Sequence, residues 1–151
     1  MLKLVRTDSS HADFRELVRL LDEDLSLRDG AAHPFYAQFN TLDAIRHVVV
    51  AYEQDRPVGC GAIKRYDETT VEIKRMFVRP ENRGRGIAAA ILRELEQWAA
   101  ELGFATAILE TGKQQPEAIR LYQKSGYTLM PNYGQYALAQ NSVCMQKPLM
   151  G

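Results

Sequence analysis

Residues 79–88 read RPENRGRGIA, and this stretch decides the fold. Its two glycines, Gly84 and Gly86, stand directly ahead of a long segment with helical periodicity. Glycine at a helix start costs backbone entropy, so a pair of glycines there indicates that something approaches the backbone closely. A helix N-terminus offers unpaired N–H groups and the positive end of the helix dipole, which suit a phosphate. We therefore interpret the stretch as a phosphate-binding turn.

The segment behind this turn predicts an amphipathic helix over 84–102. Apolar residues recur there at intervals of four, four, three and four, namely Ile87, Ile91, Leu95, Trp98 and Leu102. This spacing places them on one face of a helix, and Gly103 is a typical residue to end it.

Strands are predicted on both sides of that helix. The segments 70–78 (TVEIKRMFV) and 104–110 (FATAILE) are rich in β-branched and apolar residues, so strand, helix and strand form a βαβ unit with two parallel strands. Segments 47–53 and 58–66 precede it across short turns and predict an antiparallel meander. The remaining predicted elements are a strand at 1–6, helices at 11–27, 41–46 and 116–125, and strands at 127–130 and 142–149.

This order predicts a mixed α/β fold with a mostly antiparallel sheet and one central βαβ crossover. The length of 151 residues is typical of one domain, so we expect a single domain over 1–151.

Charge and composition exclude several classes of protein. Lysine and arginine together number 19, as do aspartate and glutamate, which argues against a nucleic-acid-binding surface. The three histidines show no metal-ligand spacing, and no segment approaches the roughly 18 apolar residues of a membrane span. We expect a cytoplasmic protein that needs no metal and contacts neither membrane nor nucleic acid.

A dinucleotide is one candidate for the bound phosphate. Gly84, Gly86 and Ala89 match the pattern GxGxxA, and Glu110 follows at the end of the next strand. In dinucleotide folds, however, the first glycine comes almost directly after a strand within repeated βα units, whereas five residues, 79–83, intervene here. A pyrophosphate held by the successive amides of a nest, with small residues at 84, 86 and 88, fits better. Arg83 and Arg85 would add positive charge at its rim.

The chain resembles the GNAT family of N-acetyltransferases. The strand EIKRMFV (72–78), the turn RGRGIA (83–88) and the segment EAIRLYQKSGY (117–127) occur in the order and spacing of that family. The resemblance covers nearly the whole chain. It implies the acyl-CoA acyltransferase fold, in which acetyl-CoA binds where the two parallel strands splay apart.

The resemblance also implies the cofactor-binding residues. The amides of Arg85, Gly86, Ile87 and Ala88 would hold the pyrophosphate, and Met76, Phe77 and Val78 would pair with the pantetheine arm like an added strand. Many family members carry an asparagine seven residues before the helix tyrosine, where this chain has Gln115, whose amide would make the same contact from a longer side chain.

Chemistry requires three groups for transfer of an acetyl group to an amine: a donor for the oxyanion, a proton donor for the thiolate and a base for the amine. The resemblance points to the backbone N–H of Val78 for the oxyanion and to Tyr122 for the thiolate, although a tyrosine at this helix position is also compatible with core packing. For the base it points to Glu72, with Glu110 in reserve and a water chain as a further alternative. The alternative for Glu72 is a salt bridge with Lys74 or Arg65.

The acceptor is expected to be a small amine, such as an amino acid, or a peptide amine. The segments 28–40 and 131–140 would flank the cleft, and their aromatic and polar residues include His33, Tyr36 and Tyr133 but few acids. A polycation would call for several carboxylates. The family resemblance implies a homodimer. Two other interpretations stay open: a non-catalytic acyl-CoA sensor that keeps only the phosphate site, and the dinucleotide enzyme above.

Overall fold

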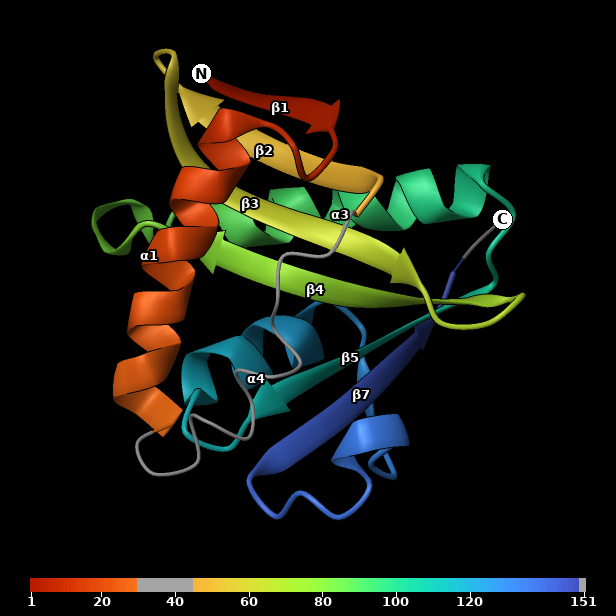
Figure 1. Cartoon of the computed structure of the whole chain (residues 1–151). Helices are drawn as coiled ribbons and strands as arrows, with labels where there is room; N and C mark the ends of the chain where they lie inside the picture. The colour runs from red at the N-terminus through yellow and green to blue at the C-terminus, as the bar shows by residue number, and fades with distance from the viewer. Residues whose placement is uncertain (30–44, 150–151) are drawn as a thin grey trace.

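The computed structural model describes residues 1–29 and 45–149 and is built on a seven-stranded sheet (Figure 1). Its strand order is β1-β2-β3-β4-β5-β7-β6. The strands are β1 (Leu2–Thr7), β2 (His47–Glu53), β3 (Arg56–Arg65), β4 (Thr70–Val78), β5 (Thr106–Gly112), β6 (Thr128–Met130) and β7 (Ser142–Pro148). The α-helices of the described residues are α1 (Ala12–Asp29), α3 (Ile87–Glu101) and α4 (Pro116–Lys124), and short 3-10 turns cover Pro80–Asn82 and Gly134–Tyr136.

The first four strands form an antiparallel meander. Gln54 and Asp55, with φ angles of 50° and 66°, make the two-residue turn between β2 and β3, a conformation that gives a hairpin the twist its strands need. After β4 the chain crosses over through α3 and returns as β5, parallel to β4. The strands β5, β7 and β6 then pair antiparallel.

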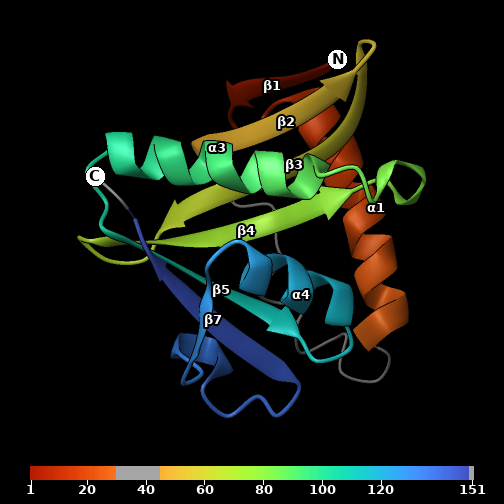
Figure 2. The ribbon, with the colours of Figure 1, turned by 180° about the vertical axis from the view of Figure 1, so that it is seen from behind.

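Helices cover both faces of the sheet. Figure 1 shows α1 in front of the sheet, and Figure 2, turned by 180°, shows α3 and α4 in front of the opposite face. Each face has its own buried cluster of apolar side chains. Phe14, Leu17 and Val18 of α1 pack on one face, whereas Ile91 and Leu95 of α3 pack on the other.

The predicted fold class is confirmed. The βαβ unit, the meander and the closing strands lie where the sequence placed them, with ends that differ by at most three residues. The helix predicted over 84–102 begins at Ile87, because the glycines ahead of it adopt left-handed φ angles. The helix predicted over 41–46 falls largely outside the described residues, and its last two, Ile45 and Arg46, are not helical.

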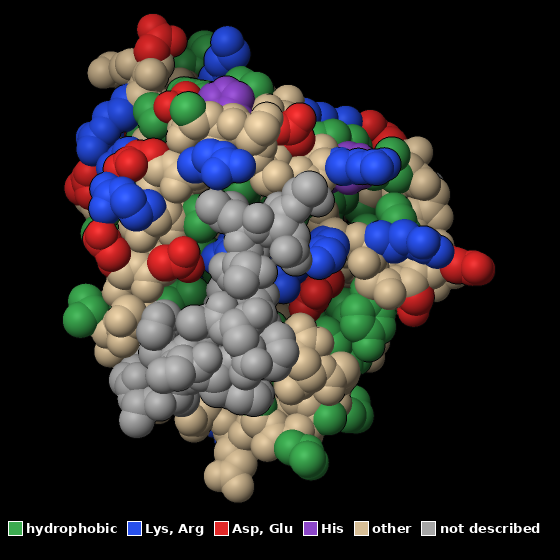
Figure 3. Space-filling model, in the orientation of Figure 1, with side chains coloured by type: hydrophobic (Ala, Val, Ile, Leu, Met, Phe, Trp, Pro, Cys, Tyr) green, Lys and Arg blue, Asp and Glu red, His purple; other side chains and the backbone are tan. Residues whose placement is uncertain are grey.

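Basic and acidic side chains alternate over the described part of the α1 face (Figure 3). This mixture agrees with the equal numbers of the two kinds of charge in the sequence.

The apolar stripe of α3 makes a stability prediction. Leu95 is fully buried against the sheet, so Leu95→Ala leaves a cavity and should lower the free energy of unfolding by about 2–5 kcal/mol. Leu102, at the end of the same helix, is 46% exposed, and Leu102→Ala should change it by less than about 0.5 kcal/mol. Urea unfolding of the two variants measures the difference, and equal losses would contradict this packing.

Candidate active site

The two parallel strands separate soon after they meet. Within the described residues, β4 and β5 pair only at Thr70–Thr106, Val71–Ala107 and Glu72–Ile108. Beyond Glu72 each strand runs on without the other, and both views of the ribbon show them diverging (Figures 1 and 2). The backbone groups along this opening have no partner on the neighbouring strand. Because buried N–H and C=O groups require partners, a ligand that enters the opening is able to supply them.

A β-bulge lies in β4 beside the opening. The register against β3 shifts between Cys60–Phe77 and Ala62–Lys74, which leaves Arg75 and Met76 opposite the single residue Gly61. Arg75 has a φ of 60°, a left-handed conformation that costs a residue with a Cβ on the order of 1–3 kcal/mol. Bulges redirect side chains, and such strain is found most often at functional sites.

The N-terminus of α3 forms an anion-binding cradle. Gly86 is its N-cap with a φ of 80°, Gly84 has a φ of 81°, and no side chain caps the helix. The first backbone hydrogen bond of the helix runs from the Ala90 N–H to the Gly86 carbonyl. The amides from Gly86 to Ala89 have no backbone acceptor among the described residues, so they are free to bind an anion.

A cleft of about 430 Å³ leads from this cradle along the end of β4 to α4. The cradle contributes Gly84, Gly86 and Ala88, and α4 contributes Tyr122 together with Gln115 at its N-cap. The cleft thus joins the cradle at the N-terminus of α3 to the open edge of a strand. This geometry fits a ligand with a pyrophosphate at one end and a long arm able to hydrogen-bond to a strand.

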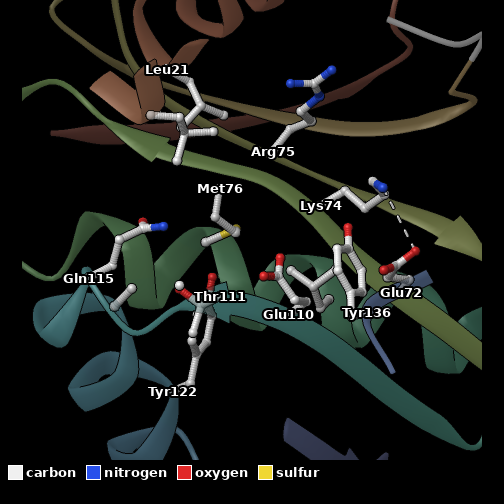
Figure 4. Close-up of a pocket in the computed structure, with 14 residues that line it drawn as sticks. Leu21, Glu72, Lys74, Arg75, Met76, Glu110, Thr111, Gln115, Tyr122 and Tyr136 are labelled. Atoms are coloured by element: carbon white, nitrogen blue, oxygen red, sulfur yellow. Dashed lines mark ion pairs between the residues drawn. The ribbon is translucent and has the colours of Figure 1, made fainter. Parts of the chain in front are cut away.

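A smaller cavity of about 120 Å³ lies at the mouth of the opening (Figure 4). It shares Met76, Gln115 and Tyr122 with the cleft, so the two spaces meet at these side chains. Its other polar lining residues are Glu72, Lys74, Arg75, Glu110, Thr111 and Tyr136.

A family model described as "Acetyltransferase (GNAT) family" matches residues 14–127, which is most of the chain. The chain belongs to the GNAT family. It is 39% identical over 102 residues to an IAA acetyltransferase of Azospirillum brasilense, a match that covers 67% of each chain. It is also 29% identical over 141 residues to the "Uncharacterized N-acetyltransferase YsnE" of Bacillus subtilis, covering 89% of this chain and 93% of that one.

Solved structures share the GNAT fold over the whole chain. A protein of Klebsiella pneumoniae described as an acyl-CoA N-acyltransferase superposes with a TM-score of 0.82 at 28% identity, covering 99% of both chains. The PaiA N-acetyltransferase of Thermoplasma acidophilum, solved in complex with coenzyme A, has the same fold with a TM-score of 0.73 at 14% identity, covering 98% of this chain and 99% of that one.

The GNAT fold brings most of the predicted cofactor residues together at the cleft. Those that line it are Met76, Phe77, Val78, Arg83, Gly84, Gly86, Ile87, Ala88, Gln115 and Tyr122. Arg85 differs, because its side chain turns away to pair with Glu53 at 3.1 Å, which leaves only its backbone beside the cradle. The dinucleotide interpretation is wrong, because the described sheet holds one parallel pair of strands in place of repeated βα units.

Val78 lies at the end of β4 with its amide at the open edge. The next residue, Arg79, donates its N–H to Val58 of β3, and amides along a strand alternate in direction. The Val78 N–H therefore faces away from β3 and toward the opening. The Val78 carbonyl points the same way, since it accepts a hydrogen bond from Nε of Arg83 at 2.9 Å.

Tyr122 lies where the cleft and the small cavity meet. It is 6% exposed, and its ring packs edge-on against Tyr127 with centroids 5.8 Å apart. Burial, and after it the Glu110 carboxylate, raises the pKa of Tyr122 well above its ordinary value. The hydroxyl therefore keeps its proton at neutral pH and is able to donate it.

Glu72 and Glu110 both face the small cavity. Glu72 is 8% exposed and accepts a hydrogen bond of 2.7 Å from the Tyr133 hydroxyl, while Nζ of Lys74 lies 3.9 Å away. Glu110 accepts a hydrogen bond of 2.8 Å from the Ser142 hydroxyl. Tyr133, predicted as a substrate contact, thus holds Glu72, and burial together with that carboxylate raises the pKa of Tyr133.

The sequence did not single out Arg75, which is the most unusual side chain of the site. Only 1% of its side chain is exposed, and Nη1 pairs with Oδ1 of Asp22 at 3.1 Å. Its Nε and Nη2 atoms are buried without a hydrogen-bond partner. One signal was present, because Lys74 and Arg75 are consecutive charged residues in a strand, which breaks the alternation of inward and outward side chains.

Two predicted substrate contacts, His33 and Tyr36, lie outside the described residues. Across residues 1–29 and 45–149, no cluster of histidine, cysteine, aspartate or glutamate is arranged to hold a metal ion. In the same ranges, no helix has the length and hydropathy to cross a membrane.

The contact between Tyr133 and Glu72 makes a prediction about stability. Tyr133→Phe leaves a buried carboxylate without its donor and should lower the free energy of unfolding by about 1–3 kcal/mol. In a double-mutant cycle with Glu72→Gln, the two changes should be non-additive by about 0.5–3 kcal/mol. Tyr127→Phe, which removes a hydroxyl bound to Glu96, is the control and should be additive with Glu72→Gln. Additivity in both cycles would show that the Tyr133 contact is absent in solution.

Proposed function

We propose that this protein transfers an acetyl group from acetyl-CoA directly to a primary amine, either a small molecule or a peptide amine, while both substrates are bound. Family membership supports the acetyltransferase activity. Direct transfer to an amine is supported by one observation: the cleft and the small cavity meet at Met76, Gln115 and Tyr122. The cleft with the anion cradle suits the acetyl donor, and the small cavity with two carboxylates suits the amine.

The residues of the cleft fit coenzyme A. The amides from Arg85 to Ala88 would hold its pyrophosphate, with the dipole of α3 behind them and Arg83 beside them. The open edge of Met76, Phe77 and Val78 would pair with the pantetheine arm, and Gln115 would offer its amide to that arm. When bound, acetyl-CoA supplies an acetyl group activated as a thioester.

Three groups of the chain would serve the reaction. The Val78 N–H faces the opening and would stabilise negative charge on the carbonyl oxygen. The Tyr122 hydroxyl, which stays protonated, would donate its proton to the departing sulfur. Glu72 or Glu110 would accept the proton of the amine, directly or through water, because both carboxylates line the cavity.

A non-catalytic acyl-CoA sensor needs the cradle but neither a proton donor nor a base, so the presence of both favours an enzyme. The test is release of free thiol from acetyl-CoA in the presence of primary amines. Stabilisation of the fold by acetyl-CoA without thiol release from any amine would favour the sensor. A homodimer and a cytoplasmic location stay predictions of the sequence.

Tyr122→Phe should lower kcat by about 10²–10⁴-fold, because it removes the proton donor for the leaving group. Its affinity for coenzyme A should be unchanged, since the cradle lies elsewhere. Tyr127→Phe is the matched control, because its hydroxyl binds Glu96 away from the cavity, and it should leave kcat unaltered. Initial rates of thiol release and calorimetric titration with coenzyme A measure both effects. A wild-type kcat in Tyr122→Phe would exclude the acid role.

Gly86→Ala should weaken coenzyme A binding by about tenfold or more. Alanine disfavours the φ of 80° that directs the amides of the cradle, and a shift of the backbone that loses one hydrogen bond to a charged group costs about 1.5–3 kcal/mol. Its φ of 80° also disfavours alanine, at a cost of about 1–2 kcal/mol in stability.

Gly103→Ala separates the loss of coenzyme A affinity from the loss of stability. Gly103 has a φ of 93°, and like Gly86 it has open space around an added Cβ, but it lies at the far end of α3. Both variants should lose similar stability in thermal unfolding, whereas only Gly86→Ala should lose coenzyme A affinity. Equal affinities would argue against the cradle as the pyrophosphate site.

A further inference from the structure

The two carboxylates of the small cavity lie at different depths of the opening between β4 and β5. Glu72 belongs to the last paired position of the two strands, with Ile108 as its partner. Glu110 lies two residues farther along β5, where that strand has left β4. Each residue of a strand adds about 3.3 Å, so Glu110 stands about 7 Å farther along the opening than the last pair. Val78, the proposed oxyanion donor, lies beyond that pair as well, at the end of β4.

The side chains in the cavity follow the same order. In Figure 4 the Glu110 carboxylate lies between Tyr122 and Tyr136. Glu72 lies beyond Tyr136, beside Lys74. Burial, and after it Glu110, raises the pKa of Tyr122, and no other carboxylate of the described residues contributes. Burial also raises the pKa of Tyr136, on which Glu110 acts more strongly than Glu72. Glu110 is therefore the carboxylate closer to Tyr122, where the cavity meets the cleft.

Glu72 makes its contacts within the protein. It accepts the hydrogen bond of 2.7 Å from the Tyr133 hydroxyl, and Nζ of Lys74 lies 3.9 Å from it. Only 10% of its side chain is exposed. These contacts tie the segment that follows β6 to β4, which is a structural role.

The Glu110 carboxylate is oriented by a hydroxyl of the neighbouring strand. Ser142, the first residue of β7, is 4% exposed, and its Oγ donates to Oε2 of Glu110 at 2.8 Å. The backbone of Ser142 is fixed in turn. Its N–H donates to the Ala139 carbonyl at 3.2 Å, and its carbonyl accepts a hydrogen bond of 3.2 Å from Nδ2 of Asn132. A buried hydroxyl on a fixed backbone holds the carboxylate in one orientation, as supporting residues do in preorganised sites.

We propose, on the basis of the acetyl transfer proposed above, that Glu110 is the base of the reaction and that Ser142 is the positioning residue that directs its carboxylate. Glu110 accepts the proton that the neutral amine loses as its nitrogen bonds to the acetyl carbon. Tyr122 gives its proton to the sulfur as the C–S bond breaks. The proton then passes from Glu110 to the Tyr122 oxygen, directly or through water, and restores both groups. One proton has thus moved from nitrogen to sulfur.

The first test compares two isosteric substitutions in the thiol-release assay. The acceptor is the primary amine with the highest kcat/KM in a panel of the common amino acids, their decarboxylated amines and short peptides. Glu110→Gln should lower kcat by about 10²–10⁴-fold, because it removes the base. Calorimetric titration should show an unchanged affinity for coenzyme A. Glu72→Gln should lower kcat far less than Glu110→Gln, because it removes a structural contact.

Ser142→Ala tests the positioning role through the pH profile of kcat, measured at saturating amine so that ionisation of the free amine drops out. A hydrogen bond donated to a carboxylate favours its ionised form. Without the hydroxyl, the acid limb of the profile should therefore move to higher pH, and kcat should fall with little change in KM. Ser10→Ala is the matched control, because the Ser10 hydroxyl binds the exposed Asp8, which does not line the cavity. Its profile should match the wild type.

Other titratable or charged side chains also face Glu110. They come from β4, α4, the 3-10 turn after β6 and β7, and they are Glu72, Lys74, Arg75, Tyr122, Tyr136 and Cys144. Ser142→Ala replaces none of them. The limb belongs to Glu110 if Glu110→Gln removes it and Glu72→Gln retains it, which is the expected result.

Three results would overturn the inference. A wild-type kcat in Glu110→Gln, with a large loss in Glu72→Gln, would exchange the two roles and leave the acetyl transfer intact. An acid limb that stays in place in Ser142→Ala would refute the pairing of Ser142 with the base, even if Glu110→Gln fails to fold. Release of no thiol by the wild-type protein with any amine, while acetyl-CoA still raises the melting temperature, would overturn the proposed transfer together with this inference.

Discussion

The site depends on the absence of hydrogen bonds between β4 and β5 beyond Glu72 and Ile108. A sheet normally gains stability by pairing every strand along its length, and unpaired buried backbone groups are costly. Here the gap opens in the middle of the sheet. The chain continues from β4 toward α3 and from β5 toward α4, so a helix follows each of the two strands that border the gap. The same gap gives the cleft its strand edge, leaves the Val78 amide facing the opening and lets Tyr122 line the cleft. The remaining sheet and both layers of helices hold the two strands apart.

The bulge in β4 adds a second constraint on the same strand. Five consecutive residues of β4, from Glu72 to Met76, line the small cavity, so the cavity touches the strand on both of its faces. The extra residue of the bulge lies opposite Gly61, and a bulky side chain at position 61 is excluded because an added Cβ would meet Met76 and Leu95. The shape of the cavity is therefore set partly from β3, a strand that does not reach it.

The cradle and the fold could be predicted from the sequence because their signals are local. The spacing of Ile87, Ile91 and Leu95 defines α3, and the glycines ahead of it mark left-handed backbone. The partners of the carboxylates could not be predicted, since Tyr133 meets Glu72 across 61 residues of sequence. Arg75 was missed because its ion-pair partner Asp22 is 53 residues away on α1 and because only the paired strand reveals the bulge on which it lies.

A sheet that splits in the middle has four edges in place of two, and exposed edges invite pairing with other chains. The outer edges are poor templates, because β6 has three residues and β1 carries the exposed Lys3. The inner edges are longer but open on the cleft of about 430 Å³, which residues of α1, α3 and α4 also line. A cleft of this size admits a single thin chain and excludes a second sheet. The geometry that accepts a narrow ligand therefore also guards the protein against edge-to-edge aggregation.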